Sequence, residues 1–415
     1  MNSWTRAMVV ATATIMARAA AGQGTSLPEA VGPALLPAAS IAALKGAERS
    51  AWTAYISRSR QLRATDSASM AAELRRSGRT EMMKAPYRAP DFTYFNRPDA
   101  WFRGDSAQAL GSAILTWQTP SGGWSKRTDM WQPRTTGMSY YSETSGWHYI
   151  PTFDNGATTG QLRFLARLYA ANHAANYANA YRRGLALLLV AQQPNGCWPQ
   201  SFPLDGGYHD AVTFNDDVAV LVLTTLDEAA SGAANIPSAS ERRAAWEAAK
   251  RGVACLVRAQ VRVAGARTVW GQQEDPLTLE VVPARRYELA GLAGRESASI
   301  MLYLMSLRDP DSPVQSAVHS AATWFRSHAL SGLRYERFEL RPDTAAPPLW
   351  ARLTEISTGR PIFANRDAVK LYDWNQLSDR RSGYGWFGRE PAEALRQYEE
   401  WARVHPLRAS TGGHE

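Results

Sequence analysis

The sequence contains few cysteines. Only Cys197 and Cys255 occur among the 415 residues, which excludes a disulfide framework. A zinc site would then depend on histidine ligands, and the spacing of His148, His173 and His209 does not suit one. Two isolated cysteines are more often buried thiols, so we favour free thiols over a disulfide, although an exported protein could form one.

The chain also has no long hydrophobic run. No stretch approaches the length of about 18 apolar residues that spans a bilayer, so we expect no membrane partner. The apolar run from Ala7 to Ala17 follows Arg6 and precedes a small-residue cleavage site at residues 19–21. This pattern predicts a signal peptide over residues 1–21. We therefore expect a secreted or periplasmic protein.

The charge is only mildly unbalanced. Lys and Arg number 46 and Asp and Glu 38, a net charge of +8 that permits an acidic partner without requiring one. Basic residues are scattered and no reader motif occurs, so we expect no nucleic-acid partner. Neither a glycine-rich phosphate loop nor the D-x-D-D motif of terpenoid cyclases is present. By contrast, 15 tryptophans and 16 tyrosines suggest a surface that stacks on flat ligands such as sugars.

An internal repeat organises the middle of the chain. The pattern Q-x-x-x-G-x-W occurs at Gln118–Trp124 and again at Gln192–Trp198, with a looser copy from Gln260 to Trp270. Each copy follows a helical pattern. We interpret it as a helix that ends in a glycine-bearing turn, whose tryptophan folds back over the helix end and is held by the glutamine. Where the turn reaches a ligand site, Trp124 and Trp198 would double as sugar platforms.

Hydrophobic periodicity predicts the fold class. Apolar residues at helical spacing predict an all-α fold, an (α/α) barrel or toroid of antiparallel helix hairpins with short irregular β segments, the latter around residues 268–282. The predicted helices are 41–76, 107–117, 156–172, 181–192, 217–229, 240–260, 295–307 and 314–328. The predicted division is a signal peptide (1–21), a linker (22–40), an N-terminal helical extension (41–98), a catalytic domain (99–390) and a C-terminal helix and tail (391–415).

Two similar loops each precede a helix. Residues 152–155 read T-F-D-N and residues 213–216 read T-F-N-D. An Asp or Asn in this place is often an ordinary N-cap, and that alternative stays open. Together, however, Asp154 and Asp216 offer hard oxygen ligands, and two carboxylates suffice for a weak calcium site that the substrate completes.

Two arginine pairs accompany aromatic residues. Arg285-Arg286 precedes Tyr287, and Arg380-Arg381 precedes G-Y-G-W at residues 383–386. Such pairs are commonly solvated charge. The alternative is a clamp for carboxylates, because guanidinium binds a carboxylate through two parallel hydrogen bonds and stacks on aromatic rings. Acidic metal ligands, arginines and aromatic platforms together suit an acidic sugar polymer.

These motifs resemble those of family-10 polysaccharide lyases, the pectate lyases. The resemblance covers residues 107–388 and rests on G-G-W-S-K-x-T-D-M, T-F-D-N-G-A-T, G-Y-H-D-x-x-T-F-N-D, P-A-R-x-Y-E with a following E-S, and R-R-x-G-Y-x-W. It implies a toroid-like (α/α) fold and calcium-dependent cleavage of polygalacturonate by β-elimination. The helical segment at 41–76 resembles an extension of bacterial members.

The resemblance also implies roles for individual residues. Asp154 and Asp216 would bind Ca²⁺, and Arg285 would be the catalytic base, although the neighbouring Arg286 leaves that assignment ambiguous by one residue. Lys126, Arg380 and Arg381 would hold uronate carboxylates. We further expect substrate contacts from Asn155, Asp210, Arg286 and Tyr287.

An arginine base requires an explanation, because the pKa of free arginine is about 12.5 or more. We expect bound calcium and the neighbouring Arg286 or Arg295 to lower the pKa of Arg285, and we expect an alkaline optimum. Two other interpretations remain. One is an inverting glycoside hydrolase that uses Asp154 and Asp216, and the other is a non-catalytic uronate-binding protein. We expect a monomer that acts on polygalacturonate or pectin.

Overall fold

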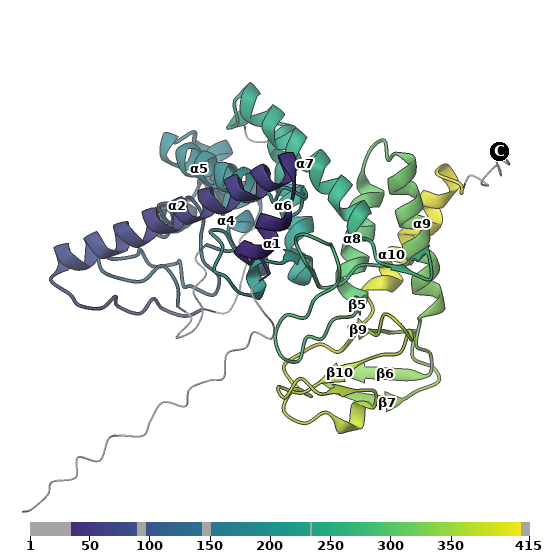
Figure 1. The fold of residues 1–415 in the computed structure, drawn as a ribbon. Helices are drawn as coiled ribbons and strands as arrows, with labels where there is room; N and C mark the ends of the chain where they lie inside the picture. Colours follow the sequence, from purple (N-terminus) through teal and green to yellow (C-terminus); the bar gives the residue numbers. More distant parts are fainter. Residues whose placement is uncertain (1–34, 89–96, 143–150, 233–234, 408–415) are drawn as a thin grey trace, which may run out of the picture.

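The computed structural model describes residues 35–88, 97–142, 151–232 and 235–407 (Figure 1). The predicted signal peptide, most of the predicted linker and His148 lie outside these ranges. Within them, no helix combines the length and apolar character that a membrane crossing requires.

The predicted helices are present, with ends that shift by a few residues. The α-helices are α1 (Ala38–Ala43), α2 (Gly46–Ser77), α3 (Asp105–Thr116), α4 (Thr159–Asn172), α5 (Ala175–Ala191), α6 (Val218–Ala230), α7 (Ala239–Ala259), α8 (Gly294–Ser306), α9 (Ser312–Ser327) and α10 (Glu390–Val404). Short 3-10 helices include η2 (Asp99–Arg103), η3 (Asp154–Gly156), η4 (Tyr208–Asp210), η5 (Asn215–Asp217) and η7 (Trp374–Gln376).

The helices form two rows. The helices α3, α5, α7 and α9 pack side by side in one row, and α4, α6, α8 and α10 in the other. The pairs α4–α5, α6–α7 and α8–α9 are hairpins that join the rows. Apolar stripes explain the packing: α6, for example, buries Val218, Val222, Leu223 and Leu226. The predicted array of helix hairpins is confirmed. In the part of the chain described, the rows do not close into a barrel.

The glutamine of each repeat links neighbouring helices. The side-chain nitrogen of Gln192 donates to the carbonyl oxygen of Gly196 at 2.7 Å, within its own turn, and to that of Ala248 at 2.8 Å, on α7. The same two bonds recur in the other copies, from Gln118 to Gly122 and Ala180 and from Gln260 to Thr268 and Ala317. We expected the glutamine to hold the tryptophan of its own turn. The two bonds described here instead fix the turn and connect it to the next helix of its row.

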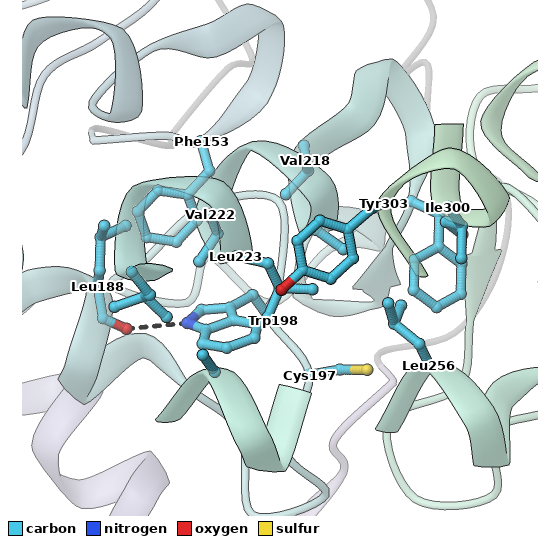
Figure 2. Packing of buried hydrophobic residues seen from close by; sticks show 14 of the residues in the cluster. Phe153, Leu188, Cys197, Trp198, Val218, Val222, Leu223, Leu256, Ile300 and Tyr303 are labelled. Carbon is cyan, nitrogen blue, oxygen red and sulfur yellow. Dashed lines mark hydrogen bonds between the residues drawn. The ribbon is translucent and has the colours of Figure 1, made fainter. Parts of the chain in front are cut away.

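The repeat tryptophans belong to the core. The indole nitrogen of Trp198 donates to the carbonyl oxygen of Leu188 at 2.8 Å, and its ring packs beside Val222 and Leu223 (Figure 2). Trp124 bonds Ile114 and Trp270 bonds Leu256 in the same way. The exposed fractions of Trp124 and Trp198 are 0% and 1%, so the prediction that they serve as sugar platforms is wrong. A ring that closes the end of a helix cannot also face a ligand.

The structure contains a fourth copy of this turn. The indole nitrogen of Trp350 donates to the carbonyl oxygen of Phe325, on α9, at 2.8 Å. In the other copies the glutamine lies four residues after this acceptor, and here that position is Ala329. The loop between Ala329 and Trp350 also contains an inserted hairpin. Without the glutamine and with this insertion, the copy could not be recognised from the sequence.

Short strands are more numerous than the sequence predicted. They are β1 (Val212–Thr213), β2 (Arg262–Val263), β3 (Ala266–Arg267), β4 (Gln273–Glu274), β5 (Leu292–Ala293), β6 (Leu333–Glu336), β7 (Glu339–Pro342), β8 (Trp350–Ala351), β9 (Leu353–Thr354), β10 (Phe363–Ala364), β11 (Lys370–Leu371) and β12 (Phe387–Gly388). The antiparallel pairs are β1–β4, β2–β3, β5–β9, β6–β7, β8–β12 and β10–β11. Residues 330–388 form a lobe below α8–α10 with an aromatic core of its own (Figure 1). Strands of two residues carry no alternation by which they could be predicted.

Cys197 and Cys255 form a disulfide with a Cα–Cα distance of 5.6 Å. Our preference for two free thiols was therefore wrong. Cys197 lies in the second tryptophan turn and Cys255 on α7, the helix that Gln192 also bonds. The repeat packing thus brings together two residues that are 58 positions apart.

The helix α2 of the N-terminal extension spans the first two turns. The Tyr55 hydroxyl donates to the carbonyl oxygen of Ala191, directly before the second turn, at 3.0 Å. The carboxylate of Asp66 accepts hydrogen bonds from the amide and hydroxyl of Ser121, in the first turn, at 2.8 and 2.6 Å. The extension is therefore bonded to the same turns that organise the repeat.

Replacing Gln192 by alanine should destabilise the protein by about 2–4 kcal/mol, because the variant leaves the buried carbonyls of Gly196 and Ala248 without this donor. Urea unfolding measures the effect. The matched control is Gln397→Ala on the exposed face of α10, which should change the free energy of unfolding by less than about 0.5 kcal/mol. Equal effects of the two substitutions would contradict the proposed link between turns and helices.

Candidate functional site

A small pocket lies where the loops before α4 and α6 meet. Five of the residues singled out from the sequence line it: Lys126, Asp154, Asn155, Asp216 and Arg285. The other lining residues are Arg127, Gln200, Tyr208, Asn215, Gln273, Ala284 and Glu288. Loops from successive hairpins therefore converge on one pocket.

The repeat explains this convergence. After each tryptophan turn the chain returns to start a helix, and the backbone amide of Thr152 donates to the carbonyl oxygen of Trp124 at 3.1 Å. The next amide, of Phe153, donates to the carbonyl oxygen of Gln200 at 2.9 Å. The same pair of bonds recurs twice: Thr213 to Trp198 with Phe214 to Gln272, and Ala293 to Trp270 with Gly294 to Arg352.

These bonds define equivalent positions. Asp154, Asn215 and Arg295 are counterparts in the three copies, and so are Asn155, Asp216 and Glu296. Two residues after the tryptophan of each turn come Lys126, Gln200, Gln272 and Arg352. The carboxylates of T-F-D-N and T-F-N-D thus occupy adjacent positions in neighbouring repeats.

The backbone of both loops is constrained. Asn155 has φ 53° and Asp216 has φ 49°, in the left-handed region that Asn and Asp tolerate better than most residues. Neither α4 nor α6 has a side-chain N-cap hydrogen bond. The N-cap alternative for Asp154 and Asp216 is therefore wrong, and both carboxylates are left for the pocket.

Asp154 is buried and tightly paired. Its carboxylate forms an ion pair with the Lys126 ammonium and accepts a hydrogen bond from the Asn155 amide at 2.7 Å. Burial by itself raises the pKa of Asp154, but Lys126 and the Asn155 hydrogen bond outweigh it and lower the pKa to about 2. Asp154 is therefore ionised over the ordinary pH range.

Asp216 has weaker partners. One carboxylate oxygen accepts from the amides of Asn155 and Asn215 at 3.3 and 3.1 Å. The other lies 3.5 Å from the Arg295 guanidinium and 3.8 Å from that of Arg352. Burial, and then the charge of Asp154, raises the pKa of Asp216. The two carboxylates thus share the amide of Asn155 and repel each other.

This donor set suits a hard divalent cation. Two carboxylates and the amide oxygens of neighbouring asparagines are ligands that calcium accepts, with the remaining positions filled by water or substrate. Across the described stretches, no group of three His, Cys, Asp or Glu residues is arranged to hold a metal ion. The chain by itself therefore offers an incomplete coordination shell at this place.

Arg285 is held by Glu288. Its Nε donates to the Glu288 carboxylate at 2.7 Å, Nη2 donates to the second oxygen, and its backbone amide also bonds this carboxylate, at 3.2 Å. Burial alone would lower the pKa of Arg285, but the Glu288 charge raises it well above the usual value. The lowering that we expected from Arg286 or Arg295 is therefore absent, because the nearest charge is a buried carboxylate.

The other arginines predicted to bind substrate, Arg286, Arg380 and Arg381, lie outside the pocket lining. Arg286 donates to the carbonyl oxygen of Arg366 at 2.6 Å, which separates its position from that of Arg285. The Arg380 guanidinium lies 4.0 Å from the centre of the Tyr287 ring, and that of Arg285 lies 5.0 Å from the same ring. Tyr287 is buried, and Arg381 pairs with Glu339 at 3.1 Å. Among these residues, Arg380 shares the Tyr287 ring with Arg285, which lines the pocket.

Asp210 shapes the loop that carries Tyr208. Its carboxylate accepts hydrogen bonds from the backbone amides of Asp205 and Gly206, both at 3.0 Å, and it is buried. We predicted a substrate contact for Asp210. The structure instead engages its carboxylate within the loop, and the residue does not line the pocket.

Several lining residues were not predicted. Gln200, Tyr208, Gln273 and Glu288 contribute to the pocket, and Arg352 lies beneath Asn215, to which its guanidinium donates at 3.0 Å. The positions of Gln200 and Arg352 could have been found by counting two residues beyond each tryptophan turn. Tyr208 and Glu288 lie within the motifs G-Y-H-D and P-A-R-x-Y-E but were given no role, and Gln273 carries no comparable pattern.

Comparisons with known proteins give consistent results. The family model described as pectic acid lyase matches residues 118–395. A family 10 polysaccharide lyase from Cellvibrio cellulosa is similar in structure, with a TM-score of 0.65 and 31% sequence identity over 75% of this chain and 95% of that one. An Asp-to-Ala mutant of a family 10 polysaccharide lyase from the same organism, in complex with trigalacturonic acid, gives a TM-score of 0.64 and 30% identity over 75% and 99% of the two chains. No curated protein sequence matches this chain.

The buried Asp210 predicts a pH dependence of stability. Burial, and then the charge of Asp205, raises the pKa of Asp210 to about 7, whereas the unfolded chain has a value near 4. Between these pH values the folded state holds a proton that the unfolded state has lost, so the free energy of unfolding should fall as pH rises from about 4 to about 7.

Urea unfolding from pH 4.5 to pH 8 should therefore show wild type losing stability relative to Asp210→Asn, by about 1 kcal/mol or more. The exposed substitution Asp309→Asn is the matched control and should run parallel to wild type. A constant difference between wild type and Asp210→Asn over this range would contradict the raised pKa.

Proposed function

This chain belongs to the pectic acid lyase family and is a pectate lyase, and we propose that it cleaves polygalacturonate by calcium-assisted β-elimination with Arg285 as the base. One observation carries the proposal: a single pocket contains Asp154, Asp216 and Arg285. The products would be oligogalacturonides with an unsaturated sugar at the new non-reducing end.

The reaction explains why these groups are needed together. The C5 proton of a galacturonate lies next to a carboxylate, so its removal adds negative charge to a group that is already anionic. Positive groups around that carboxylate stabilise the developing charge, and losing one such group typically costs about 10²–10³ in rate. In this proposal Arg285 takes the C5 proton, the C4–oxygen bond breaks, and the double bond forms between C4 and C5.

Calcium would be held by Asp154 and Asp216. The fit is supported by the two repelling carboxylates, the buried Asp154 and the partly exposed Asp216, which share the Asn155 amide and offer only hard oxygen donors. When bound, the ion supplies positive charge at the uronate carboxylate. Lys126 is then the protein's own cation next to Asp154, and we expect it to face the uronate carboxylate as well.

Glu288 would orient the base. It engages Nε and Nη2 of Arg285, which leaves Nη1 as the nitrogen not bonded to Glu288 and our choice for the proton acceptor. Because the pKa of Arg285 is raised, only a small fraction of the enzyme carries a neutral guanidine at neutral pH. The rate should therefore increase with pH into the alkaline range.

The hydrolase alternative is disfavoured by geometry. An inverting hydrolase needs carboxyl groups roughly 6.5–9.5 Å apart, with one of them protonated. Here Asp154 and Asp216 both bond one amide nitrogen, at 2.7 and 3.3 Å. That spacing leaves too little room for the attacking water.

We also propose that the protein acts outside the cytoplasm. The support is the Cys197–Cys255 disulfide, since disulfides persist mainly in oxidising compartments, together with the predicted signal peptide. Polygalacturonate is a polymer that such a compartment would contain.

Substitution of the two adjacent arginines tests the base. Arg285→Ala should lower kcat by about 10²–10⁴, because it removes both the proton acceptor and a positive charge. Arg286→Ala should stay within about threefold of wild type, since that guanidinium bonds the Arg366 carbonyl. The measurement is ultraviolet absorbance of the unsaturated product, from pH 7 to pH 11. A larger loss for Arg286→Ala, or a rate maximum below pH 7, would overturn the assignment.

Removal of divalent cations tests the metal. Chelation should abolish product formation on polygalacturonate, and added calcium should restore it, because without the ion the pocket presents two carboxylates to an anionic substrate. Asp216→Asn should need a higher calcium concentration for half-maximal rate. Reducing ends without ultraviolet absorbance would indicate hydrolysis, and full activity in chelator would exclude the calcium proposal.

A further inference from the structure

The third repeat places a cation beside the acidic pair. By the equivalence of backbone bonds, Arg295 occupies the position that Asp154 has in the first repeat and Asn215 in the second. It lies in the first turn of α8, and the side chain is 35% exposed. The three repeats thus place an acidic residue (Asp154), a neutral residue (Asn215) and a basic residue (Arg295) at one equivalent position.

Arg295 is shared among three acids. Its guanidinium lies 3.5 Å from Asp216, 3.7 Å from Asp217 and 3.9 Å from Glu390. Other cations around the pocket are held more closely: Arg352 bonds Glu296 at 2.6 Å, and Lys126 is in direct contact with Asp154. A side chain without a close partner, and one-third exposed, can move between its neighbours at little cost.

Asp216 therefore lacks a close counter-ion of its own. Asp154 has Lys126, whereas the nearest cationic nitrogens to Asp216 are the 3.5 Å contact with Arg295 and the 3.8 Å contact with Arg352. Arg352 is committed to the buried Glu296. Of these two, only Arg295 has alternative acids, Asp217 and Glu390, to which it can turn.

We infer that Arg295 is a displaceable counter-cation of Asp216 and sets the affinity of this carboxylate for a divalent cation. The inference rests on the proposed calcium site. A divalent ion at Asp216 competes with Arg295 for this carboxylate. When the ion binds, the Arg295 guanidinium keeps Asp217 and Glu390 as partners. It then shifts toward the neighbouring pocket lined by Trp350, Phe387 and Glu390. Arg295 is thus a positioning residue and need not contact the substrate.

The expected effect follows from the charges. Removing one positive charge a few ångströms from a divalent site relieves a charge repulsion, which persists at a partly exposed location when the salt concentration is low. Arg295→Gln should therefore bind calcium roughly tenfold more tightly than wild type. Arg295→Lys keeps the charge and should stay within about threefold of wild type. Glu390→Gln removes an alternative partner and should weaken calcium binding by about threefold.

The test is a thermal unfolding titration with calcium chloride at low ionic strength, without substrate. The rise in Tm with calcium concentration yields the dissociation constant, even for a millimolar site. The matched control is Arg326→Gln on α9, which removes the same charge from the remote pair with Glu399 and should leave calcium affinity unchanged. Repeating the titration at 0.5 M salt should shrink the difference between wild type and Arg295→Gln.

The outcomes separate this inference from the proposed function. Tighter binding by Arg295→Gln, with Arg295→Lys and Arg326→Gln unchanged, supports it. If wild type binds calcium and Arg295→Gln binds equally well or more weakly, the counter-cation role is wrong while the calcium site stands. If neither protein responds to calcium, the inference is overturned, because Arg295 then controls no calcium binding by the free protein, and the chelation assay on polygalacturonate tests the calcium proposal separately. Should Arg295→Gln not fold, an unchanged affinity in Glu390→Gln would overturn the inference.

Discussion

The buried tryptophan turn is the constraint on which the rest of this structure depends. In each of the first three copies a glutamine amide ties the turn to the next helix of the row, and in all four an indole closes the preceding helix. The backbone after each turn is fixed as a result, and the next helix starts from the same pair of amide bonds. Adjacent repeats therefore deliver their polar loops to one place, and the pocket is a consequence of the packing of the core.

The pocket combines like charges that a solvent-exposed site would not hold together. Asp154 stays ionised because Lys126 is in contact with it, whereas Asp216 lies partly exposed beside Asp154, with cations only at 3.5 Å and beyond. The protein therefore supplies a close counter-ion for Asp154 but none for Asp216. Arg285 shows the opposite balance, since the buried Glu288 stabilises its charged form. The proposed lyase chemistry depends on the first feature, whereas the second opposes formation of the neutral guanidine and confines the reaction to alkaline pH.

Two further parts of the chain complete the surroundings of the site. The β lobe supplies Tyr384, whose hydroxyl bonds Gln272. Strand β8, which pairs with β12, directly precedes Arg352, and the Arg352 guanidinium donates to Asn215. On the other side, α2 bonds the first two turns, and the Arg63 guanidinium bonds the carbonyl oxygen of Leu204 at 2.9 Å, at the start of the loop that carries Tyr208. Both parts act on the pocket by fixing the loops that line it.

The sequence by itself determined the helical class, the turns and the acidic and basic residues of the pocket, because these depend on local periodicity and on a repeated motif. Features that depend on contacts between distant residues were decided by the tertiary structure alone. The disulfide and the fourth turn depend on contacts between distant segments, and two-residue strands leave no periodic trace. Most of all, the charge state of Arg285 and the loose pairing of Asp216 follow from which side chains are brought within a few ångströms, and Glu288 and Arg295 become partners only when the loops fold together.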